Sequence, residues 1–361
     1  MRNIKILGGG LSGLTAAINL AKAGYNVDVF EKRSDCGKRF LGDLEGIENW
    51  SSTTDVIEEF ESMNIKTNFK YTPFKTVCIS DGDELLKNTL KKPMFYIVKR
   101  GAIENSLDQG LKNQALDLGV NIHFNTKENK ENMDIISTGP SIKKAIGMVK
   151  GISFESESDD IAIALLNLEA STGGYSYLLI SNGYGCICSV NVLVAGNNVN
   201  KYFQKTYEIL TRLADINIKN KKQVGGIGCF LLNPRYVENG KIYTGEAAGY
   251  QDMLWGFGMR YAITSGYLAA KSIIENKNYK RLIKKNLSDK LKTSVVNRYY
   301  AEKYRDIAYG YTFKQAKKNL DTWINLLYER CNPSLLSRVM YPYAKWYLSK
   351  KIRSINKDLK R

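Results

Sequence analysis

Three glycines near the start of the chain have the spacing of a dinucleotide-binding turn. Gly8, Gly10 and Gly13 follow a short apolar segment and precede a run of small and apolar residues. A strand, turn and helix of this kind present free N–H groups and the positive helix dipole to a pyrophosphate. Glu31 ends the next apolar segment, where a carboxylate can accept hydrogen bonds from ribose hydroxyls. The alternative, a glycine-rich turn of an unrelated α/β protein, leaves Glu31 unexplained.

The elements around this turn predict an α/β fold with two interleaved domains. The chain has 361 residues, 43% of them apolar, which is enough for more than one core. Apolar segments near residues 122 and 135 complete a Rossmann-like parallel sheet with the first crossover. An antiparallel, β-rich stretch is inserted, with a hairpin formed by residues 173–180 and 185–192. We expect a nucleotide-binding domain in 1–50, 95–144 and 220–275, a substrate domain in 51–94 and 145–219, and a basic helical C-terminal region in 276–361.

The cysteine and histidine content argues against several kinds of site. The six cysteines lack C-x-x-C spacing, and Cys186 and Cys188 are interpreted as lying on alternate faces of a strand. The single histidine, His123, is interpreted as a structural residue of a strand, so zinc chemistry and Ser–His catalysis are disfavoured. We therefore predict no metal and assign the difficult chemical step to a cofactor. Thr53 or Thr54 is expected to cap a short helix that ends at Met63.

Hydropathy and the residues after Met1 favour a cytoplasmic protein with free thiols. No apolar run reaches the ~18 residues that a membrane-spanning helix needs. Lys5 and the glycines so close to Met1 argue against a secretory signal.

Positive charge gathers in the last quarter of the chain. Residues 271–361 contain 23 Lys and Arg against 7 Asp and Glu, a net charge of +16, whereas the first 270 residues carry +1. Amphipathic aromatic rings beside cations suit the headgroup layer of an anionic membrane. An ordinary helical cap and a lysine-rich composition are the alternatives, and nucleic-acid binding has only the charge in its favour. The interleaved aromatic residues are Tyr299, Tyr300, Tyr304, Tyr341, Tyr343, Trp346 and Tyr347.

Two further segments, 137–140 and 245–258, also join a strand to a glycine turn. With the first turn, they resemble the two-domain FAD-dependent oxidoreductases of the glutathione-reductase-like flavoprotein superfamily. Within it, the chain is most similar to the geranylgeranyl reductase family, which is related to the p-hydroxybenzoate-hydroxylase-type monooxygenases. The resemblance extends over residues 1–275 and is strongest at the first turn.

The resemblance implies FAD as the cofactor and gives roles to individual residues. Glu246 lies where the acid of the family binds the ribityl chain, and Arg100 resembles an arginine that reaches the flavin. Residues 255–259 lie where the family runs Gly-x-Gly-Ile beside the isoalloxazine ring, and close backbone approach explains such glycines. The residues expected at FAD are Gly8, Gly10, Leu11, Ser12, Gly13, Glu31, Lys32, Arg39, Arg100, Gly139, Gly245, Glu246, Gly256, Phe257, Gly258 and Met259.

Fewer residues are expected at the substrate. Tyr175, Tyr177 and Trp255 are the substrate-binding candidates, and Cys36 is the one catalytic candidate, with a buried bystander thiol as its alternative. The acid that would supply a proton has no sequence signature.

The chain also departs from the family pattern. Glu246 replaces an Asp, the usual Ala-Asp-Gly turn reads Ser137-Thr-Gly139, and the proline before the Gly-x-Gly is absent. The Tyr-x-Trp-x-Phe-Pro signature of the substrate sheet survives only as Tyr175-Ser-Tyr177-Leu-Leu-Ile, with no Trp and no Pro. These departures bear on the substrate and on catalysis more than on the fold.

The resulting functional hypothesis is an FAD-dependent oxidoreductase that reduces carbon–carbon double bonds of a lipophilic substrate, with a polyprenyl chain as one candidate. Hydride would pass from reduced flavin to the alkene, and an acid or solvent would supply the proton. Because residues 225–228 are expected to lack a strand before them and a helix after them, no second dinucleotide site is expected. Electrons would come from NAD(P)H that docks transiently, or from a separate redox carrier.

Two alternatives come from other classes of protein. The first is a flavin monooxygenase of a small aromatic or carrier-bound substrate; a halogenase is disfavoured because no Trp-x-Trp-x-Ile-Pro element is present. The second is a binding protein on a flavoprotein scaffold that has lost catalysis. An anionic membrane surface is expected as a partner of residues 276–361, so the cytoplasmic protein would associate with membranes.

Overall fold

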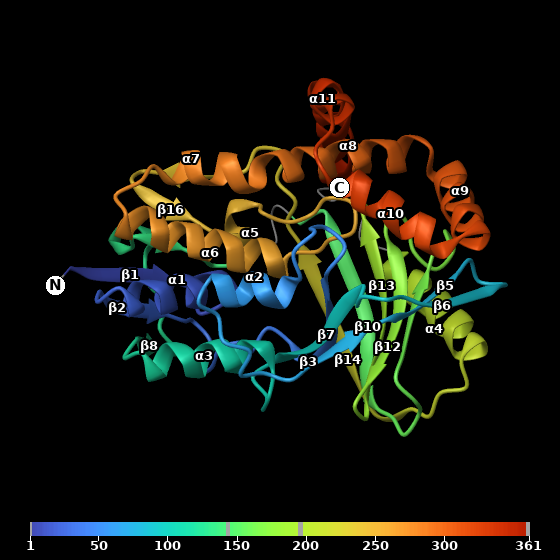
Figure 1. Ribbon diagram of the computed structural model, residues 1–361, viewed down its shortest axis with the longest axis horizontal. Helices are drawn as coiled ribbons and strands as arrows, with labels where there is room; N and C mark the ends of the chain where they lie inside the picture. The colour runs from blue at the N-terminus through green and yellow to red at the C-terminus, as the bar shows by residue number, and fades with distance from the viewer. Residues whose placement is uncertain (1, 142–144, 194–197, 359–361) are drawn as a thin grey trace.

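The N-terminal crossover builds a mostly parallel sheet. The computed structural model describes residues 2–141, 145–193 and 198–358 (Figure 1). Strand β1 (Asn3–Leu7), helix α1 (Leu11–Lys22) and strand β2 (Asn26–Phe30) form the predicted unit, and β1 pairs with β2 in parallel. The six-stranded sheet has the order β15-β16-β9-β1-β2-β8, in which only β15 is antiparallel to its neighbour. The other strands are β8 (Asn121–His123), β9 (Ile135–Ile136), β15 (Val237–Glu238) and β16 (Lys241–Tyr243).

Helix α1 lies between two other helices, and this close packing explains its small residues. It contacts α3 (Leu107–Asp117) and α6 (Met259–Ile274). A Cβ on Gly266 of α6 would lie 2.2 Å from the backbone oxygen of Ser12, so α1 and α6 cross at backbone distance. Helix α2 (Val56–Ser62) is capped by Asp55, which accepts from the N–H of Ile57 at 2.9 Å. The prediction of Thr53 or Thr54 as the cap was wrong, because the helix starts later.

The inserted sheet is larger than the sequence pattern indicated. Its seven strands have the order β14-β10-β13-β12-β11-β5-β6, antiparallel except between β11 and β5. The predicted hairpin is confirmed as β12 and β13, joined around residues 181–184. Strand β14 continues this sheet to Gly228, so the sheet extends beyond the domain boundary expected at residue 220. The strands are β5 (Thr76–Ser80), β6 (Leu85–Thr89), β10 (Gly147–Glu155), β11 (Ile161–Leu165), β12 (Tyr175–Ser181), β13 (Tyr184–Val192) and β14 (Lys219–Gly228).

A small sheet joins the two large ones. Strand β7 (Phe95–Gly101) lies between β3 (Leu41–Glu48) and β4 (Tyr71–Phe74), and β3 contacts both the inserted sheet and α6. Helix α4 (Val199–Leu213) packs on the inserted sheet. Cys186 and Cys188 of β13 point to the same face, with their sulfur atoms 3.2 Å apart. The interpretation as alternate faces was wrong, because side chains two apart in a strand share a face.

The C-terminal region is helical, as predicted, and runs across the top of both large sheets in Figure 1. A short π-helical segment, Lys284–Ser288, joins α7 to α8. Val295 and Tyr299 of α8 share a buried cluster with Val192 of β13 and with Ala344 and Leu348 of α11. Within the described ranges, no helix is both long and apolar enough to cross a bilayer. The helices are α7 (Tyr279–Ile283), α8 (Asp289–Lys303), α9 (Arg305–Lys318), α10 (Leu320–Cys331) and α11 (Leu335–Asp358).

Candidate functional site

The three predicted glycine turns meet at the carboxyl ends of neighbouring parallel strands. Ser137, after β9, is hydrogen-bonded through its hydroxyl to Thr244, after β16, at 2.6 Å. The Thr244 hydroxyl donates in turn to that of Ser12, at the start of α1, at 3.2 Å. A Cβ on Gly245 would lie 2.7 Å from the Ser12 Oγ. Segments more than 100 residues apart thus lie together at the edge of the sheet where α/β proteins bind ligands.

The first turn leaves room for a phosphate. A Cβ placed on Gly10 would meet no atom within 4 Å, whereas one on Gly13 would lie 2.1 Å from the Gly8 backbone oxygen. No side chain of the described residues caps the N-terminus of α1. Glu31 accepts from the N–H groups of Gly9 and Arg33, each at 2.9 Å, which fixes its carboxylate beside the turn. Open space, free helix N–H groups and a fixed carboxylate together fit an adenine dinucleotide such as FAD.

Arg39 and Glu246 form an ion pair beside these turns. The Arg39 Nη1 lies 2.9 Å from Glu246 Oε2, and its Nη2 donates to the backbone oxygen of Ile227 at 2.8 Å. A Cβ on Gly139 would lie 3.9 Å from the Arg39 Nη1, so the guanidinium also faces the turn after β9. The longer side chain of Glu246 reaches the N–H of Cys229 as well, at 3.0 Å. Three predicted cofactor residues, Arg39, Gly139 and Glu246, therefore converge.

The turn before α6 carries an aromatic wall. The Tyr175 ring on β12 lies 5.6 Å from that of Trp255 and 6.5 Å from that of Phe257, between centroids. Tyr177 lies 6.0 Å from Tyr175, and Trp50 packs edge-on against Phe257. The structure therefore brings together the three predicted substrate residues, Tyr175, Tyr177 and Trp255, and joins them to a residue of the predicted flavin turn.

A small, partly open pocket adjoins this wall. Its volume is about 20 Å³, near that of one water molecule. Two carboxylates, Glu48 at the end of β3 and Asp252, line it. Glu48 is 3% exposed, and its Oε2 has no hydrogen-bond partner among the described residues. The other lining residues are Trp50, Ser51, Trp255, Phe257, Tyr261, Lys290, Ser294, Asn297 and Cys331.

Burial makes both of these carboxylates hard to ionise. Burial raises the pKa of Glu48 to about 7, although the nearby Arg260 cation offsets part of the effect. Burial also raises the pKa of Asp252, against the opposing hydrogen bond that its Oδ1 accepts from the Trp255 N–H at 2.6 Å. A carboxyl group with a pKa near neutrality can hold a proton and release it at physiological pH. Glu48 therefore has the properties of a proton donor, a role for which the sequence offered no candidate.

The other residues predicted at FAD have varied surroundings. The Arg100 side chain is buried and forms hydrogen bonds to both oxygens of Asp108, at 2.9 and 3.1 Å, and to Glu45 at 2.7 Å. Its contact with flavin stays a prediction, and one that requires these bonds to be exchanged. Leu11 and Met259 are buried at the starts of α1 and α6, and Lys32 is exposed beside Glu31.

Cys36 is fully buried behind the first turn. A Cβ on Gly9 would lie 2.9 Å from its sulfur, so the thiol packs against the turn at the Glu31 end. Burial, followed by the charges of Glu31 and Asp35, raises the pKa of this thiol well above its ordinary value. A neutral, enclosed thiol is a poor nucleophile, which favours the bystander interpretation over the catalytic one.

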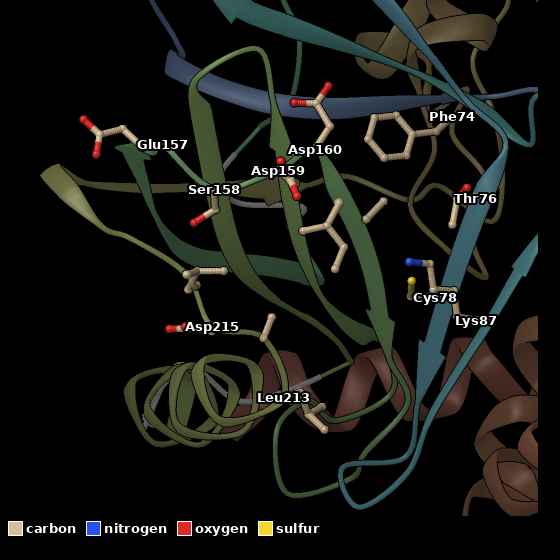
Figure 2. A pocket seen from close by; sticks show the side chains of 14 residues that line it. Phe74, Thr76, Cys78, Lys87, Glu157, Ser158, Asp159, Asp160, Leu213 and Asp215 are labelled. Atoms are coloured by element: carbon tan, nitrogen blue, oxygen red, sulfur yellow. The ribbon is translucent and has the colours of Figure 1, made fainter.

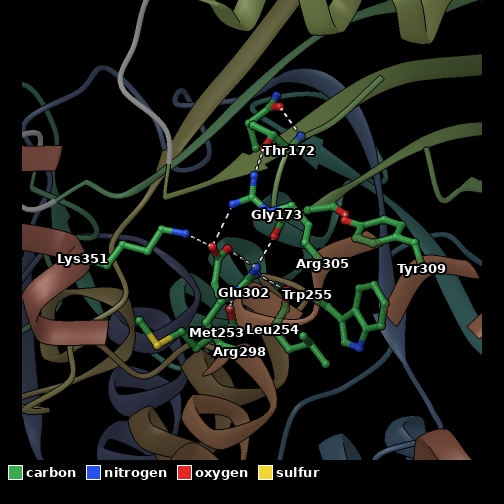
Figure 3. A network of polar contacts seen from close by, with 12 residues as sticks. Thr172, Gly173, Met253, Leu254, Trp255, Arg298, Glu302, Arg305, Tyr309 and Lys351 are labelled. Carbon is green, nitrogen blue, oxygen red and sulfur yellow. Dashed lines mark hydrogen bonds and ion pairs between the residues drawn. The ribbon is translucent and has the colours of Figure 1, made fainter. Parts of the chain in front are cut away.

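The turn before α6 is held on its other side by a buried ionic network (Figure 3). Arg298 of α8 donates to the backbone oxygens of Met253 and Leu254, and also to that of Gly173 at the entry to β12. Its guanidinium pairs with Glu302, which also pairs with Arg305 and Lys351. The Arg298 and Glu302 side chains are 1% and 0% exposed. Sequence reasoning missed this network, which lay within a tail interpreted only as basic and aromatic.

A second cavity lies away from this site. It has a volume of about 480 Å³ and is formed by β5, β6, residues 157–162 and residues 213–216 (Figure 2). Several carboxylates, among them Asp160 and Asp215, face it beside Lys87. None of the predicted site residues lines this cavity.

Comparison with known proteins shows the fold. A family model described as an NAD(P)-binding Rossmann-like domain matches residues 6–42. No curated protein matches the sequence. A solved structure described as a geranylgeranyl bacteriochlorophyll reductase-like protein from Thermoplasma acidophilum is similar over 99% of this chain and 98% of its own, with a TM-score of 0.62 and 16% identity.

Two other similar solved structures are of proteins named for other reactions. The flavin-dependent brominase Bmp2 is similar over 97% of this chain and 100% of its own, with a TM-score of 0.62 and 14% identity. The tetrameric form of 2-methyl-3-hydroxypyridine-5-carboxylic acid oxygenase is similar over 86% of this chain and 93% of its own, with a TM-score of 0.55 and 15% identity. The predicted fold class, a Rossmann-like domain with an inserted antiparallel sheet and C-terminal helices, is confirmed.

Proposed function

We propose that the protein is an FAD-dependent oxidoreductase that reduces carbon–carbon double bonds of a lipophilic substrate, with a polyprenyl chain as one candidate. The observation that carries the proposal is that open backbone at Gly10, the fixed Glu31 carboxylate and the Glu246 turn lie together at one edge of the sheet. The similar solved structures include a flavin-dependent enzyme and a reductase-like protein, which supports flavin chemistry.

The residues of these turns would hold the cofactor along its length. The N-terminus of α1 would bind the diphosphate, and Glu31 would exchange its bonds to Gly9 and Arg33 for ribose hydroxyls. Arg39 would turn from Glu246 to the diphosphate, which a guanidinium binds well, and would free Glu246 for the ribityl hydroxyls. When bound, FAD would supply the hydride equivalent for the alkene.

Glu48 would supply the proton. It shares a cavity with Trp255 and Phe257, the residues expected beside the ring, and its Oε2 faces no protein donor in the described chain. The carboxyl group would hold a proton at Oε2, release it to the carbon that has not received the hydride, and be reprotonated from solvent. Four aromatic side chains would exclude water and contact the apolar substrate: Trp50, Tyr175, Trp255 and Phe257.

Two parts of the proposal concern partners. The electron donor would be NAD(P)H docking transiently, or a separate redox carrier. Contact of the basic region 276–361 with an anionic membrane would bring a lipophilic substrate within reach of the site.

Hydroxylation is the second candidate function, because an oxygenase is among the similar structures. A fold shared by reductases and oxygenases does not decide between them. Purified protein that consumes NADPH and takes up oxygen only when substrate is present would favour hydroxylation. Anaerobic reduction of a polyprenyl double bond, followed by mass spectrometry as a gain of two hydrogens, would favour the reductase.

The cofactor itself is tested by a matched pair of glycine variants. Gly10→Val adds a side chain in open space, so it should fold and yet lose flavin. Gly310→Val, on exposed α9, also meets no atom within 4 Å and should keep flavin. We expect yellow wild-type protein that dithionite bleaches and air restores, and at least about tenfold less flavin in Gly10→Val, since a blocked diphosphate loses several hydrogen bonds.

Either of two outcomes would contradict the proposal. A colourless wild-type protein that cannot be reconstituted with FAD would support the non-catalytic scaffold. Wild-type flavin content in Gly10→Val would place any flavin away from the Gly10 turn.

A further inference from the structure

Helix α11 has two apolar faces, although a helix on a protein surface needs only one. Its inner face packs on α8, where Ala344 and Leu348 are fully buried and Ile355 nearly so. These positions are spaced four and seven residues apart, as expected for one face of a helix. The inner face accounts for the packing of α11 on the protein.

The outer face of α11 is apolar and exposed. Leu335 and Val339 are 79% and 68% exposed, and their neighbours on this face are at least 47% exposed. Spacings of four, four and three residues from Leu335 to Trp346 keep these side chains on one side of the helix. Figure 1 shows α11 projecting beyond the row of C-terminal helices. The outer face consists of Leu335, Leu336, Val339, Tyr343 and Trp346.

Cations border this outer face. Arg338, Lys350 and Arg353 are exposed, and the Lys350 ammonium lies 4.0 Å from the centre of the Trp346 ring. Helix α11 carries six Lys and Arg against one Asp, within a region of net charge +16. An apolar face that contains Trp and Tyr and is edged with Lys and Arg is typical of helices that lie in the plane of a membrane interface.

We propose that the outer face of α11 docks on a bilayer surface rich in anionic phospholipids, with its axis in the interfacial plane. The proposal rests on the proposed function only for its purpose, which is access to a lipophilic substrate. Leu335, Leu336 and Val339 enter the acyl boundary, and the aromatic rings lie among the headgroups. A second copy of the chain is the less favourable occupant, because two such regions bring like charges together.

The docking helix is linked to the candidate site by a chain of ion pairs and hydrogen bonds. Lys351 of α11 pairs with Glu302, Glu302 pairs with Arg298, and Arg298 holds the backbone of Met253 and Leu254 (Figure 3). Trp255, the next residue, belongs to the aromatic wall. When the outer face of α11 docks on a membrane, this chain of contacts sets the position of the aromatic wall relative to the membrane.

The experiment is flotation of the full-length protein with vesicles of equal parts phosphatidylcholine and phosphatidylglycerol, and with vesicles of phosphatidylcholine alone. We expect wild-type protein to float with the anionic vesicles. Leu335→Gln/Leu336→Gln/Val339→Gln should bind at least about tenfold more weakly, because it removes inserted apolar surface. Lys350→Gln/Arg353→Gln should bind roughly thirtyfold more weakly, from the loss of two cations at the surface.

Matched controls change exposed residues elsewhere. Leu41→Gln/Val237→Gln removes two exposed apolar residues, and Lys221→Gln/Lys222→Gln removes two exposed cations of β14. Both should bind as wild type. A blue shift of tryptophan fluorescence on binding should disappear in Trp346→Phe.

Three outcomes would overturn the proposal: no binding of wild type to anionic vesicles, equal binding of the α11 variants and wild type, or a wild-type dimer that the α11 variants convert to monomer. Flavin content measured on the same samples separates this proposal from the proposed function. Protein that holds flavin but does not bind vesicles would contradict only the membrane proposal. Colourless protein that binds vesicles would contradict only the proposed enzymatic function.

Discussion

The turn before α6 has two polar neighbours of opposite character. One neighbour is the buried Arg298–Glu302 network, in which every charged group has a partner. Glu302 pairs with three cations, and Arg298 donates to three backbone oxygens. On the other side, Glu48 and Asp252 share a small cavity, and Glu48 Oε2 has no partner among the described residues. Buried charge that is fully paired holds a structure together, whereas buried charge that is incompletely paired can do chemistry.

The two sides differ in the same way in their titration. Burial alone would raise the pKa of Glu302, but the charges of Arg298, Lys351 and Arg305 outweigh it and lower the pKa below its ordinary value. Burial raises the pKa of Glu48 to about 7, because the cations near it are fewer and weaker in effect. One glutamate is therefore an anion fixed by its neighbours, and the other is an acid that exchanges its proton near neutral pH.

The largest expected effect comes from breaking the paired side. Arg298→Met leaves Glu302 less compensated and frees three buried backbone oxygens, so the free energy of unfolding should fall by about 3–5 kcal/mol. Urea denaturation followed by circular dichroism measures it. Lys303→Met, on the exposed side of the same helix, is the control and should change little. A loss below about 1 kcal/mol in Arg298→Met would show that the network does not hold the fold.

The second effect concerns the unpaired side and depends on pH. Because the folded pKa of Glu48, about 7, lies above its ordinary value of 4.5, the folded protein binds this proton more tightly than the unfolded chain. The resulting stability is fully present below about pH 4.5 and is lost as the pH rises through 7. The loss amounts to about 3 kcal/mol. Glu48→Gln should abolish this part of the pH dependence.

Unfolding curves between pH 4.5 and 8 measure the effect of Glu48. Glu61→Gln, an exposed position on α2, is the control and should keep the wild-type pH dependence. An unchanged slope in Glu48→Gln would mean that the carboxyl group is ionised throughout this range, and would remove Glu48 as the proton donor.

The contrast between the two sides also explains what the sequence could predict. The turn at Gly8, Gly10 and Gly13 could be predicted because a strand, a turn and a helix are local, and the spacing of the glycines is read directly from the sequence. The parallel place of β9 beside β1 was predicted from its apolar segment, whereas the segment of β16 was recognised only as a strand that enters a glycine turn. The predicted substrate residues also met, since β12 and the turn before α6 each carried a recognisable pattern.

The polar groups around the turn have no such local signal. Glu48 is one acid in a strand that also contains Asp43 and Glu45, and only packing of β3 against α6 and α8 buries it. Arg298 is one of 23 cations in a region whose charge was interpreted as a whole. The mean charge of a segment cannot show that one of its arginines is 1% exposed and bonded to a turn about 45 residues earlier. Burial of charge is a tertiary property and required the coordinates.

A smaller effect is expected where the network reaches α11. Lys351→Met removes one of three cations from Glu302, and the lysine side chain is 29% exposed, so about 1 kcal/mol of unfolding free energy should be lost. Lys350→Met, the exposed neighbour, is the matched control for stability. A loss as large as that of Arg298→Met would mean that α11, and not α8, provides the main compensation of Glu302.

The smallest change in stability should come from Asp252→Asn, and it tests whether the two carboxylates interact. Asparagine keeps an oxygen that can accept from the Trp255 N–H, so the turn should persist and the loss should stay below about 1 kcal/mol. The charge is removed, however, and the Asp252 charge helps to raise the pKa of Glu48. The fall in stability with rising pH should therefore move to lower pH in Asp252→Asn, whereas Glu48→Gln abolishes it. If the curve does not move, the two carboxylates titrate independently, and the unpaired side is a single acid and not a pair.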